Sequence, residues 1–337
     1  MSETETKISV VVTVLNATNT IVESLNSILQ QDLPSDHFEV IVVDGGSTDG
    51  TREKLAKVTG IRVLDDPHGT IGSGRNVGIR DSIGEIIAIT DADMVVEKSW
   101  LTTLSEEFKG PSLGAVGGPI LSHPDCRGLA ALVGELREES PRFTARTEVQ
   151  HDLLYSRNIA YRRDALRKAG LFNESLVAAE DPELNWRIRD AGYELVFQPA
   201  MRVYHHHRST LGSFLKQRYR NGAGCGQLLR VNTRLRKTRR RVFTSASFWV
   251  GIVVAAFFVV TGSPLAGAIF YTGLVVFTAF CLSRGVYVYK RTMRLSYLLG
   301  ASLLMAGAWA AWSIGFLRGQ FLRALRQAPE LKNSMRT

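Results

Sequence analysis

The chain has 337 residues, a formal net charge of +9 and 45% hydrophobic residues, enough for one well-packed core and an appended segment. Its three cysteines lie far apart and lack the spacing of metal ligands, which argues against a cysteine metal site or a disulfide framework. The first seven residues are polar and acidic, so we expect no signal peptide and a cytoplasmic N-terminal part.

Apolar strands alternate with helices through the N-terminal half. This alternation indicates a mostly parallel α/β sheet, in which ligands bind at the carboxyl ends of the strands. Asn16, Asp44 and Asp91 all fall at such ends. We expect strands at 8–14, 38–43, 61–64, 85–90, 114–120, 193–197 and 201–204, and helices at 19–31, 51–58, 72–82, within 156–170 and at 182–192.

The triplet Asp91-Ala92-Asp93 closes the fourth expected strand and is a candidate metal site. Its two carboxylates stand where a strand passes into a loop, so that they can share one divalent cation. Hard oxygen ligands suit Mg²⁺ or Mn²⁺, and a substrate phosphate can complete the coordination shell. Because Asp-x-Asp also occurs in surface turns, the triplet gains its meaning from the motifs around it.

The last third of the chain has the composition of a membrane segment. Residues 218–241 are densely basic and contain no acid, and the charge-free run 242–283 follows directly. This pattern is typical of the cytoplasmic side of a membrane span, and we prefer it to nucleic-acid binding. The turn residues 261–264 interrupt the run. We therefore expect spans at about 242–261, 264–283 and 295–317.

Three spans would place the basic tail 318–337 on the outer side, against the positive-inside rule. A re-entrant third segment would remove the conflict. The alternating apolar and basic residues of the tail also suit a helix that lies on the membrane surface.

Several motifs occur in a fixed order. They are Asp44 in a Val-Val-Asp-Gly-Gly-Ser-Thr-Asp-Gly turn, Gly74 to Gly78, Asp91 to Asp93, and Ala179 to Leu184 followed by Arg187. Together with the opening strand they resemble the family 2 glycosyltransferases, inverting enzymes with the nucleotide-sugar-binding GT-A fold. The resemblance covers about residues 7–225 and suits the membrane-attached members that build exopolysaccharides or lipid-linked glycans. The implied domains are a GT-A catalytic domain at 1–225, a basic interfacial segment at 226–241, a membrane segment at 242–317 and the tail at 318–337.

The resemblance implies a donor site at the ends of the first strands. Asp44 would bind the nucleobase and Arg75 would lie near the diphosphate. By residue type alone, Asp44 also suits an Asx turn and Arg75 a solvated helix-start charge. The implied donor contacts are Thr13, Leu15, Asn16, Asp44, Arg75, Asn76, Asp91 and Ala92.

The resemblance also implies a Mg²⁺ or Mn²⁺ site. Asp93 matches the family's metal ligand, and Asp91 would contact ribose or the metal shell. Some related enzymes place a histidine on the metal or diphosphate, which makes His205 or His207 a candidate. The alternative is a histidine cluster at the surface or the edge of a cleft.

Asp181 matches the family's catalytic base, which takes the proton from the acceptor hydroxyl. Asp181 also precedes Pro182, and this pair predicts a helix N-cap followed by proline. The two roles are compatible, and Glu180 is a second candidate.

A third implied site would hold the acceptor and the diphosphate, and its candidate residues are Glu180, Gln217, Arg218 and Arg220. Gln217, Arg218 and Arg220 are similar to the Gln-x-x-Arg-Trp motif of processive polysaccharide synthases, but Asn221 replaces the tryptophan. The alternative is an interfacial amphipathic helix that binds lipid headgroups.

The sequence thus predicts an inverting, metal-dependent glycosyltransferase that is anchored by several spans in the cell membrane, with a cytoplasmic catalytic domain. We expect a UDP- or GDP-sugar donor, a polyprenyl phosphate or polyprenyl-diphosphate-linked acceptor, contact with membrane lipid and no nucleic acid. A processive polysaccharide synthase and a non-catalytic nucleotide-binding scaffold are the alternatives. A dinucleotide-dependent oxidoreductase is excluded because residues 15–18 lack its glycine fingerprint.

Overall fold

A computed structural model describes residues 7–66, 68–126, 128–130, 133, 143–149, 153–207, 210–231 and 250–326. The chain divides into two compact units. The first contains residues 1–126 and 138–207, and the second contains residues 127–137 and 208–337. The predicted catalytic-domain end at 225 falls inside a continuous helix, α8 (Leu211–Val231).

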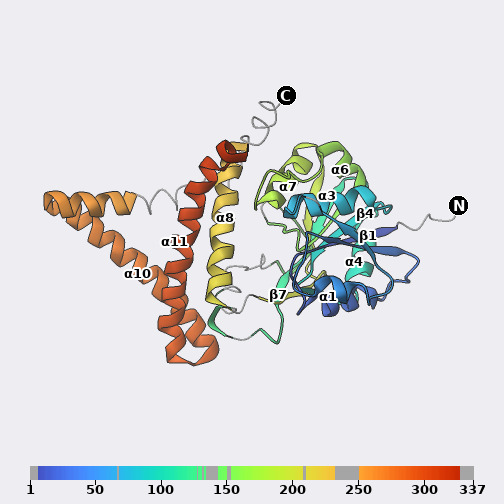
Figure 1. Ribbon diagram of the computed structural model, residues 1–337, viewed down its shortest axis with the longest axis horizontal. Helices are drawn as coiled ribbons and strands as arrows, with labels where there is room; N and C mark the ends of the chain where they lie inside the picture. The colour runs from blue at the N-terminus through green and yellow to red at the C-terminus, as the bar shows by residue number, and fades with distance from the viewer. Residues whose placement is uncertain are drawn as a thin grey trace. The chain divides into compact units, whose positions relative to one another are not determined.

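An eight-stranded sheet forms the centre of the first unit (Figure 1). Its strand order is β3-β2-β1-β4-β9-β6-β10-β8. Neighbours pair in parallel from β3 to β4 and between β6 and β10, whereas β9 and β8 run antiparallel to their neighbours. The strands are β1 (Ile8–Val14), β2 (Phe38–Asp44), β3 (Arg62–Asp65), β4 (Ile86–Asp91), β6 (Leu113–Gly117), β8 (Thr147–Glu148), β9 (Asn158–Arg162) and β10 (Glu194–Phe197).

Helices cover both faces of this sheet, as Figure 1 shows. One core packs α1 and α4 against the sheet through residues such as Leu25 and Trp100. The other core packs α3, α6 and α7 through residues such as Ile79, Leu166 and Leu184. The helices are α1 (Ile21–Leu29), α2 (Thr51–Leu55), α3 (Ile71–Asp81), α4 (Trp100–Glu107), α6 (Arg163–Ala169) and α7 (Glu180–Asp190).

Glycine brings α3 unusually close to the sheet. A Cβ at Gly78 would stand 2.4 Å from Cγ1 of Val11 on β1, a distance that side chains do not tolerate. Thr70 caps the helix, because its hydroxyl accepts from the Ser73 N–H while the Ser73 hydroxyl accepts from the Thr70 N–H. The cap and the close approach together fix the first turns of α3 on the carboxyl ends of the strands.

A second, three-stranded sheet has the order β5-β11-β7, formed by β5 (Met94–Val96), β11 (Val203–His205) and β7 (Ile120–Ser122). It pairs His205 with Met94, the residue after Asp93. Two chain segments far apart in sequence therefore meet directly beyond the end of β4.

The prediction of an α/β sheet with GT-A architecture is confirmed, and the strand at 8–14 is confirmed residue for residue. The prediction of a single strand at 114–120 was wrong, because Gly118 and Pro119 separate two strands, β6 and β7. A Cβ at Gly118 would stand 1.9 Å from the Met201 carbonyl oxygen, so the chain bends there against another segment. The helix expected within 156–170 is present as α6, but the sequence analysis missed β9 before it.

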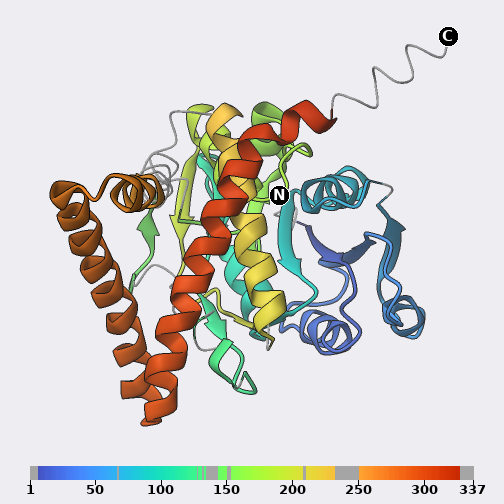
Figure 2. The ribbon, with the colours of Figure 1, turned by 60° about the vertical axis from the view of Figure 1, so that its left-hand side comes forward.

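The second unit contains α8 and two long apolar helices, α10 (Pro264–Thr292) and α11 (Leu295–Arg326). Figures 1 and 2 show α8 and α11 side by side. Small residues allow this contact: a Cβ at Gly222 would stand 2.0 Å from the Trp312 carbonyl oxygen, and a Cβ at Gly315 would stand 2.0 Å from that of Tyr219. Glycines spaced by four residues are typical of helices that pack tightly in membranes.

Two helices of this unit are long and apolar enough to cross a membrane, Pro264–Lys290 and Leu295–Gln320, and they suggest membrane association. They correspond to the second and third predicted spans. The first predicted span is described only from Val250, and Val250–Thr261 is a shorter apolar helix. Residues 242–249, most of the basic segment 226–241 and the tail beyond 326 lie outside the described residues.

Candidate active site

The guanidinium of Arg75 joins three carboxylates that come from distant parts of the first unit. Its Nη1 donates to Glu180 at 2.6 Å and to Asp181 at 3.1 Å, and its Nη2 donates to Asp91 at 3.2 Å. The Arg75 side chain is 3% exposed. Burial lowers the pKa of Arg75, but Asp91, Asp181 and Glu180 outweigh burial and raise it above its usual value. Arg75 therefore stays charged and fixes the start of α7 against the end of β4.

Asp91 lies between this cluster and the first strand. Its Oδ1 accepts from the Thr13 hydroxyl at 3.3 Å as well as from Arg75. Burial raises the pKa of Asp91, and neighbouring Asp93 raises it further, whereas Arg75 opposes both effects. Thr13 and Asp91, two of the predicted donor contacts, are thus brought together at the carboxyl ends of β1 and β4.

Asp93 and His205 form the best candidate for the divalent cation. Nε2 of His205 lies 3.4 Å from Oδ2 of Asp93. Two ligands on one cation at about 2.1 Å lie roughly 3.0–3.4 Å apart, so this separation fits a shared metal. The His205 side chain is 4% exposed and that of Asp93 is 35% exposed, which leaves the carboxylate open to a ligand. Arg157 approaches the other side of the imidazole, with Nη1 3.4 Å from Nδ1.

Asp181 has the electrostatics of a general base that works near neutral pH. Burial and the charge of Glu180 raise the pKa of its carboxyl to about 7, against the opposing effects of Arg75 and the Ser156 N–H. Burial and the charge of Asp181 also raise the pKa of Tyr161, whose hydroxyl donates to Asn185 at 2.8 Å.

The N-cap prediction for Asp181 was wrong. The helix α7 begins at Glu180, and its N-cap is Ala179 with a left-handed φ of 67°. Asp181 therefore lies within the first turn, where the helix dipole favours a carboxylate. Its side chain faces Arg75 instead of closing the helix end, and the strained backbone of Ala179 sets this entry angle.

Asp44 builds the turn after β2. Its carboxylate accepts from the Ser47 N–H at 3.0 Å and from the Ser47 hydroxyl at 2.6 Å, and Arg52 pairs with its other oxygen. The neighbouring Asn16, with φ 54°, donates its N–H to the Ser47 hydroxyl at 2.9 Å and accepts from the Thr48 N–H at 2.9 Å. The Asp44 carboxylate thus closes the turn through the N–H three residues on, not two as in the predicted Asx turn, while the Asn16 bonds to Ser47 and Thr48 fasten the β1 and β2 ends to each other.

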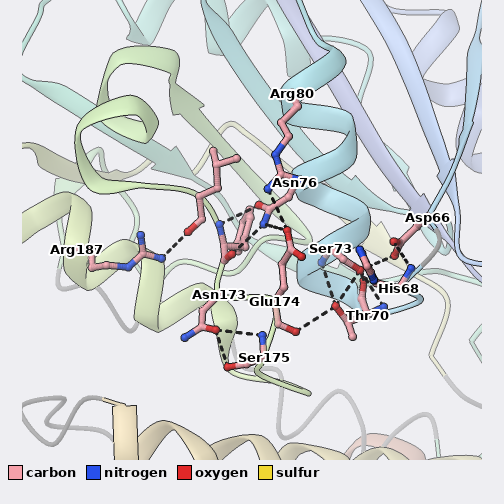
Figure 3. Close-up of polar contacts among 12 residues, drawn as sticks. Asp66, His68, Thr70, Ser73, Asn76, Arg80, Asn173, Glu174, Ser175 and Arg187 are labelled. Carbon is pink, nitrogen blue, oxygen red and sulfur yellow. Dashed lines mark hydrogen bonds and ion pairs between the residues drawn. The ribbon is translucent and has the colours of Figure 1, made fainter. Parts of the chain in front are cut away.

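Asn76 fastens a loop near the start of α7. Its amide donates to the Phe172 carbonyl oxygen and to Glu174, and its carbonyl oxygen accepts from the Phe172 N–H. Figure 3 shows Asn76 and Arg80 of α3 turned toward Glu174. The side chain of Asn76, predicted as a donor contact, thus binds the protein itself through both of its polar groups.

Known proteins resemble this chain in both sequence and fold. Residues 9–170 match the family model described as Glycosyl transferase family 2. The chain is 30% identical over 264 residues to "Glycosyltransferase AglE" of Haloferax volcanii. This match covers 74% of this chain and 82% of AglE. The chain belongs to glycosyltransferase family 2. It is therefore an enzyme of the glycosyltransferase class, as the ordered motifs predicted.

The match to another relative covers a smaller share of both proteins. This glycosyltransferase is 29% identical over 202 residues to the pre-mycofactocin glycosyltransferase of Mycobacterium tuberculosis, and the match spans 57% of this chain and 42% of that protein. Among solved structures, the mannosyltransferase PcManGT of Pyrobaculum calidifontis aligns with a TM-score of 0.63 and 20% identity, over 94% of this chain and 88% of the other. This likeness shows the shared fold.

The remaining predicted residues of the glycosyltransferase occupy varied positions. Leu15 is 53% exposed beside the β1 end, and Ala92 is 5% exposed in the core. Gln217, Arg218 and Arg220 lie on α8 in the second unit. Arg218 is buried there, with its guanidinium 5.8 Å from the Phe214 ring centroid.

Sequence reasoning missed several residues that organise the glycosyltransferase site. Arg157 was missed because it precedes an unrecognised strand, β9. Glu174 was missed because its partners Asn76 and Arg80 lie almost a hundred positions earlier. Arg75 itself was named from the Gly74 to Gly78 motif, but that motif did not reveal its three carboxylate partners.

Proposed function

We propose that this enzyme is an inverting, metal-dependent glycosyltransferase that moves a sugar from a UDP- or GDP-sugar onto a lipid-linked acceptor at a membrane. The observation that carries the proposal is the Arg75 cluster. One buried guanidinium contacts Asp91, next to the candidate metal pair, and Asp181, the candidate base. A base and a metal site fixed on one rigid frame are what a single displacement at an anomeric carbon requires.

Asp181 supplies the proton acceptor. As the acceptor oxygen forms its bond to the anomeric carbon, its proton passes to the Asp181 carboxylate, and the nucleoside diphosphate leaves with the bonding electrons from the opposite face. Because burial raises the pKa of Asp181 to about 7, its carboxylate is a stronger base than an exposed aspartate and is still ionised in a substantial fraction at neutral pH. Glu180 is bound more tightly to Arg75, at 2.6 Å against 3.1 Å, and is the weaker candidate.

Asp93 and His205 would hold the divalent cation, with Asp91 next to them. A Mg²⁺ or Mn²⁺ ion there would offset the negative charge that develops on the departing diphosphate. The open face of Asp93, at 35% exposure, is where the phosphate oxygens would reach the same centre.

The names of fold neighbours support the choice of donor. The structure of PcManGT is described as a complex with GDP-Man and Mn²⁺. A structure of Staphylococcus aureus TarS residues 1–349 with UDP-GlcNAc aligns with a TM-score of 0.51 at 19% identity. The carboxyl ends of β1 and β2, near Thr13 and Asp44, are the part of this chain that we assign to the nucleotide.

A membrane acceptor suits the apolar helices α10 and α11, because an enzyme that glycosylates a lipid carrier must work at the bilayer surface. We propose several spans with the catalytic domain in the cytoplasm. Gln217, Arg218 and Arg220 on α8 stay candidates for the acceptor or the diphosphate.

A processive polysaccharide synthase is the second candidate. The chain is 25% identical over 280 residues to the poly-beta-1,6-N-acetyl-D-glucosamine synthase of Staphylococcus epidermidis, 77% of this chain and 66% of that protein. Asn221 in place of the motif tryptophan disfavours this candidate. The non-catalytic scaffold is set aside because the family membership makes the chain an enzyme.

The test is sugar transfer by the full chain, purified in detergent, from a panel of UDP- and GDP-sugars with Mn²⁺ and a short polyprenyl phosphate. Asp181→Asn and Asp93→Asn should abolish transfer. The control Asp164→Asn should keep transfer, because Asp164 is an exposed carboxylate on α6 that pairs with Arg167 at 3.2 Å. Repeated addition of sugar to one acceptor would favour the processive synthase. Full transfer by Asp181→Asn would overturn the proposed base.

A further inference from the structure

The side chains of two histidines and a glutamate meet in the first unit, away from the Arg75 cluster. Glu23 comes from α1, His123 follows β7, and His206 follows β11. Their possible ligand atoms, one from each residue, all lie within 4.8 Å of one another. Nε2 of His206 is 2.9 Å from Oε2 of Glu23, and Nε2 of His123 is 3.4 Å from Oε1 of Glu23. Each imidazole therefore points its Nε2 at the Glu23 carboxylate.

The protein holds these rings in place before any ligand arrives. The two imidazoles stack, with centroids 3.9 Å apart and planes at 28°. The side chain of His123 is 11% exposed and that of His206 is 20% exposed, whereas Glu23 is 50% exposed and leaves one side open to solvent. Backbone bonds fix the two segments, because the His206 N–H donates to the Asp93 carbonyl oxygen and the His123 N–H donates to the His205 carbonyl oxygen, each at 3.0 Å.

This donor set is the chemistry of a borderline transition metal. Two imidazole nitrogens and a carboxylate are a common three-residue zinc site, with a fourth position open to water. Ligands at about 2.0–2.1 Å in a tetrahedral arrangement lie roughly 3.3 Å apart, close to the two nitrogen–oxygen separations observed. Mg²⁺ and Ca²⁺, in contrast, bind mainly through oxygen ligands, so a site with two imidazoles suits them poorly.

Asp125 contacts the nitrogen of His123 that faces away from Glu23. Its N–H donates to Nδ1 at 3.3 Å, and its carboxylate Oδ2 lies 3.9 Å from the same nitrogen, beyond hydrogen-bond distance. With Nδ1 accepting, the ring proton is on Nε2; a metal at Nε2 would require that proton to move to Nδ1, where the Asp125 carboxylate, after a small movement, would accept its hydrogen bond. Carboxylate–histidine–metal arrangements of this type fix the ring and strengthen the ligand.

We propose that Glu23, His123 and His206 form a second metal site, which takes Zn²⁺ or a similar ion and is separate from the Asp93–His205 pair. Successive side chains of an extended segment point to opposite sides, so His205 and His206 serve different sites although they are neighbours. The ion would fasten α1 to the two segments that position Asp93 and His205. It would thus act as a structural brace behind the donor-metal pair.

The test counts Zn²⁺ bound to the full chain in detergent by equilibrium dialysis against zinc alone. We expect Asp93→Asn to retain one tightly bound equivalent, and the double variants Asp93→Asn/His123→Gln and Asp93→Asn/Glu23→Gln to lose it. His37→Gln is the matched control. The His37 ring also lies near a carboxylate, with Nε2 3.8 Å from Oδ1 of Asp36, but among the described residues no third ligand atom joins this pair.

A second measurement does not depend on counting. Zinc should raise the melting temperature of Asp93→Asn by several degrees and should leave that of Asp93→Asn/His206→Gln unchanged. If the double variants still bind the retained equivalent with unaltered affinity, the proposed site is refuted. If Asp93→Asn binds no zinc tightly, the cluster is a hydrogen-bonded clasp and the metal proposal is overturned. Neither result bears on the transfer reaction, which the donor panel tests independently.

Discussion

Replacing Arg75 by methionine is the sharpest test of the cluster that joins the two halves of the active site. The change removes the guanidinium but keeps most of the side-chain volume. It leaves Glu180, whose side chain is 7% exposed, and Asp181, at 17%, without the cation that contacts both. Removing one partner of a buried ion pair costs about 3–5 kcal/mol. For a unit of this size each kcal/mol lowers the melting temperature by about 2–4 °C, so we expect a loss of roughly 6–20 °C.

The matched control is Arg80→Met on the same helix. Arg80 also pairs with a carboxylate, Glu174 at 3.2 Å, but its side chain is 60% exposed. Exposed pairs contribute at most about 1 kcal/mol, so the control should lose no more than about 4 °C. The assay is scanning calorimetry of the full chain in detergent, in which the first unit and the helical unit can melt separately.

The pH–rate profile adds a measurement that simple destabilisation of the fold would not change. Arg75 lowers the pKa of Asp181 against the effect of burial. Without it the base should ionise at higher pH, so the acidic limb of the pH–rate profile should shift upward in Arg75→Met and not in Arg80→Met. Equal melting losses in the two variants, together with an unmoved acidic limb, would refute the role we give to Arg75.

Three further predictions follow from the same geometry. Because the pKa of Asp181 is raised to about 7, kcat/KM of the native enzyme should fall about tenfold per pH unit below 7 and level off above it, and a flat rate profile would contradict this. Stability should decline as the pH rises from about 4 to 7, because over this range the Asp181 carboxyl is ionised in the unfolded chain but still protonated in the folded chain. His205→Gln should raise the Mn²⁺ concentration needed for half-maximal rate by at least about tenfold; an unchanged metal titration would remove His205 from the metal site. Gly315→Leu should separate α11 from α8 and lower the melting temperature of the second unit, whereas leucine at Gly273, whose Cβ would meet nothing within 4 Å, should not.

The sequence was most informative where local pattern and tertiary environment agree. The strand Ile8–Val14 is buried on both faces and is apolar nearly throughout, so its bounds were predictable. The carboxylates Asp91 and Asp93 were predictable as a site because they end a buried strand. The motif at Ala179 to Leu184 was recognised as well, although the N-cap inferred from Pro182 was wrong by two positions.

What the sequence could not provide depends on contacts between distant segments. Arg75 looks like a solvated charge at a helix start, yet its side chain is 3% exposed, because Asp91, Glu180 and Asp181 converge on it. Likewise β9 is a short run with Arg157 before it, and only its place between two other strands makes it part of the sheet. No local periodicity encodes either fact.

The position of β9 has a consequence for the synthesis of this protein. β4 is complete at Asp91, but β9, which pairs with its free side, begins at Asn158. At about 5–20 residues per second, a ribosome needs roughly 3–13 s to make the missing stretch, and throughout that interval β4 presents unpaired backbone groups. Chaperone binding to stalled nascent chains should therefore be strongest for chains that end between these two strands, and should fall once β9 has emerged.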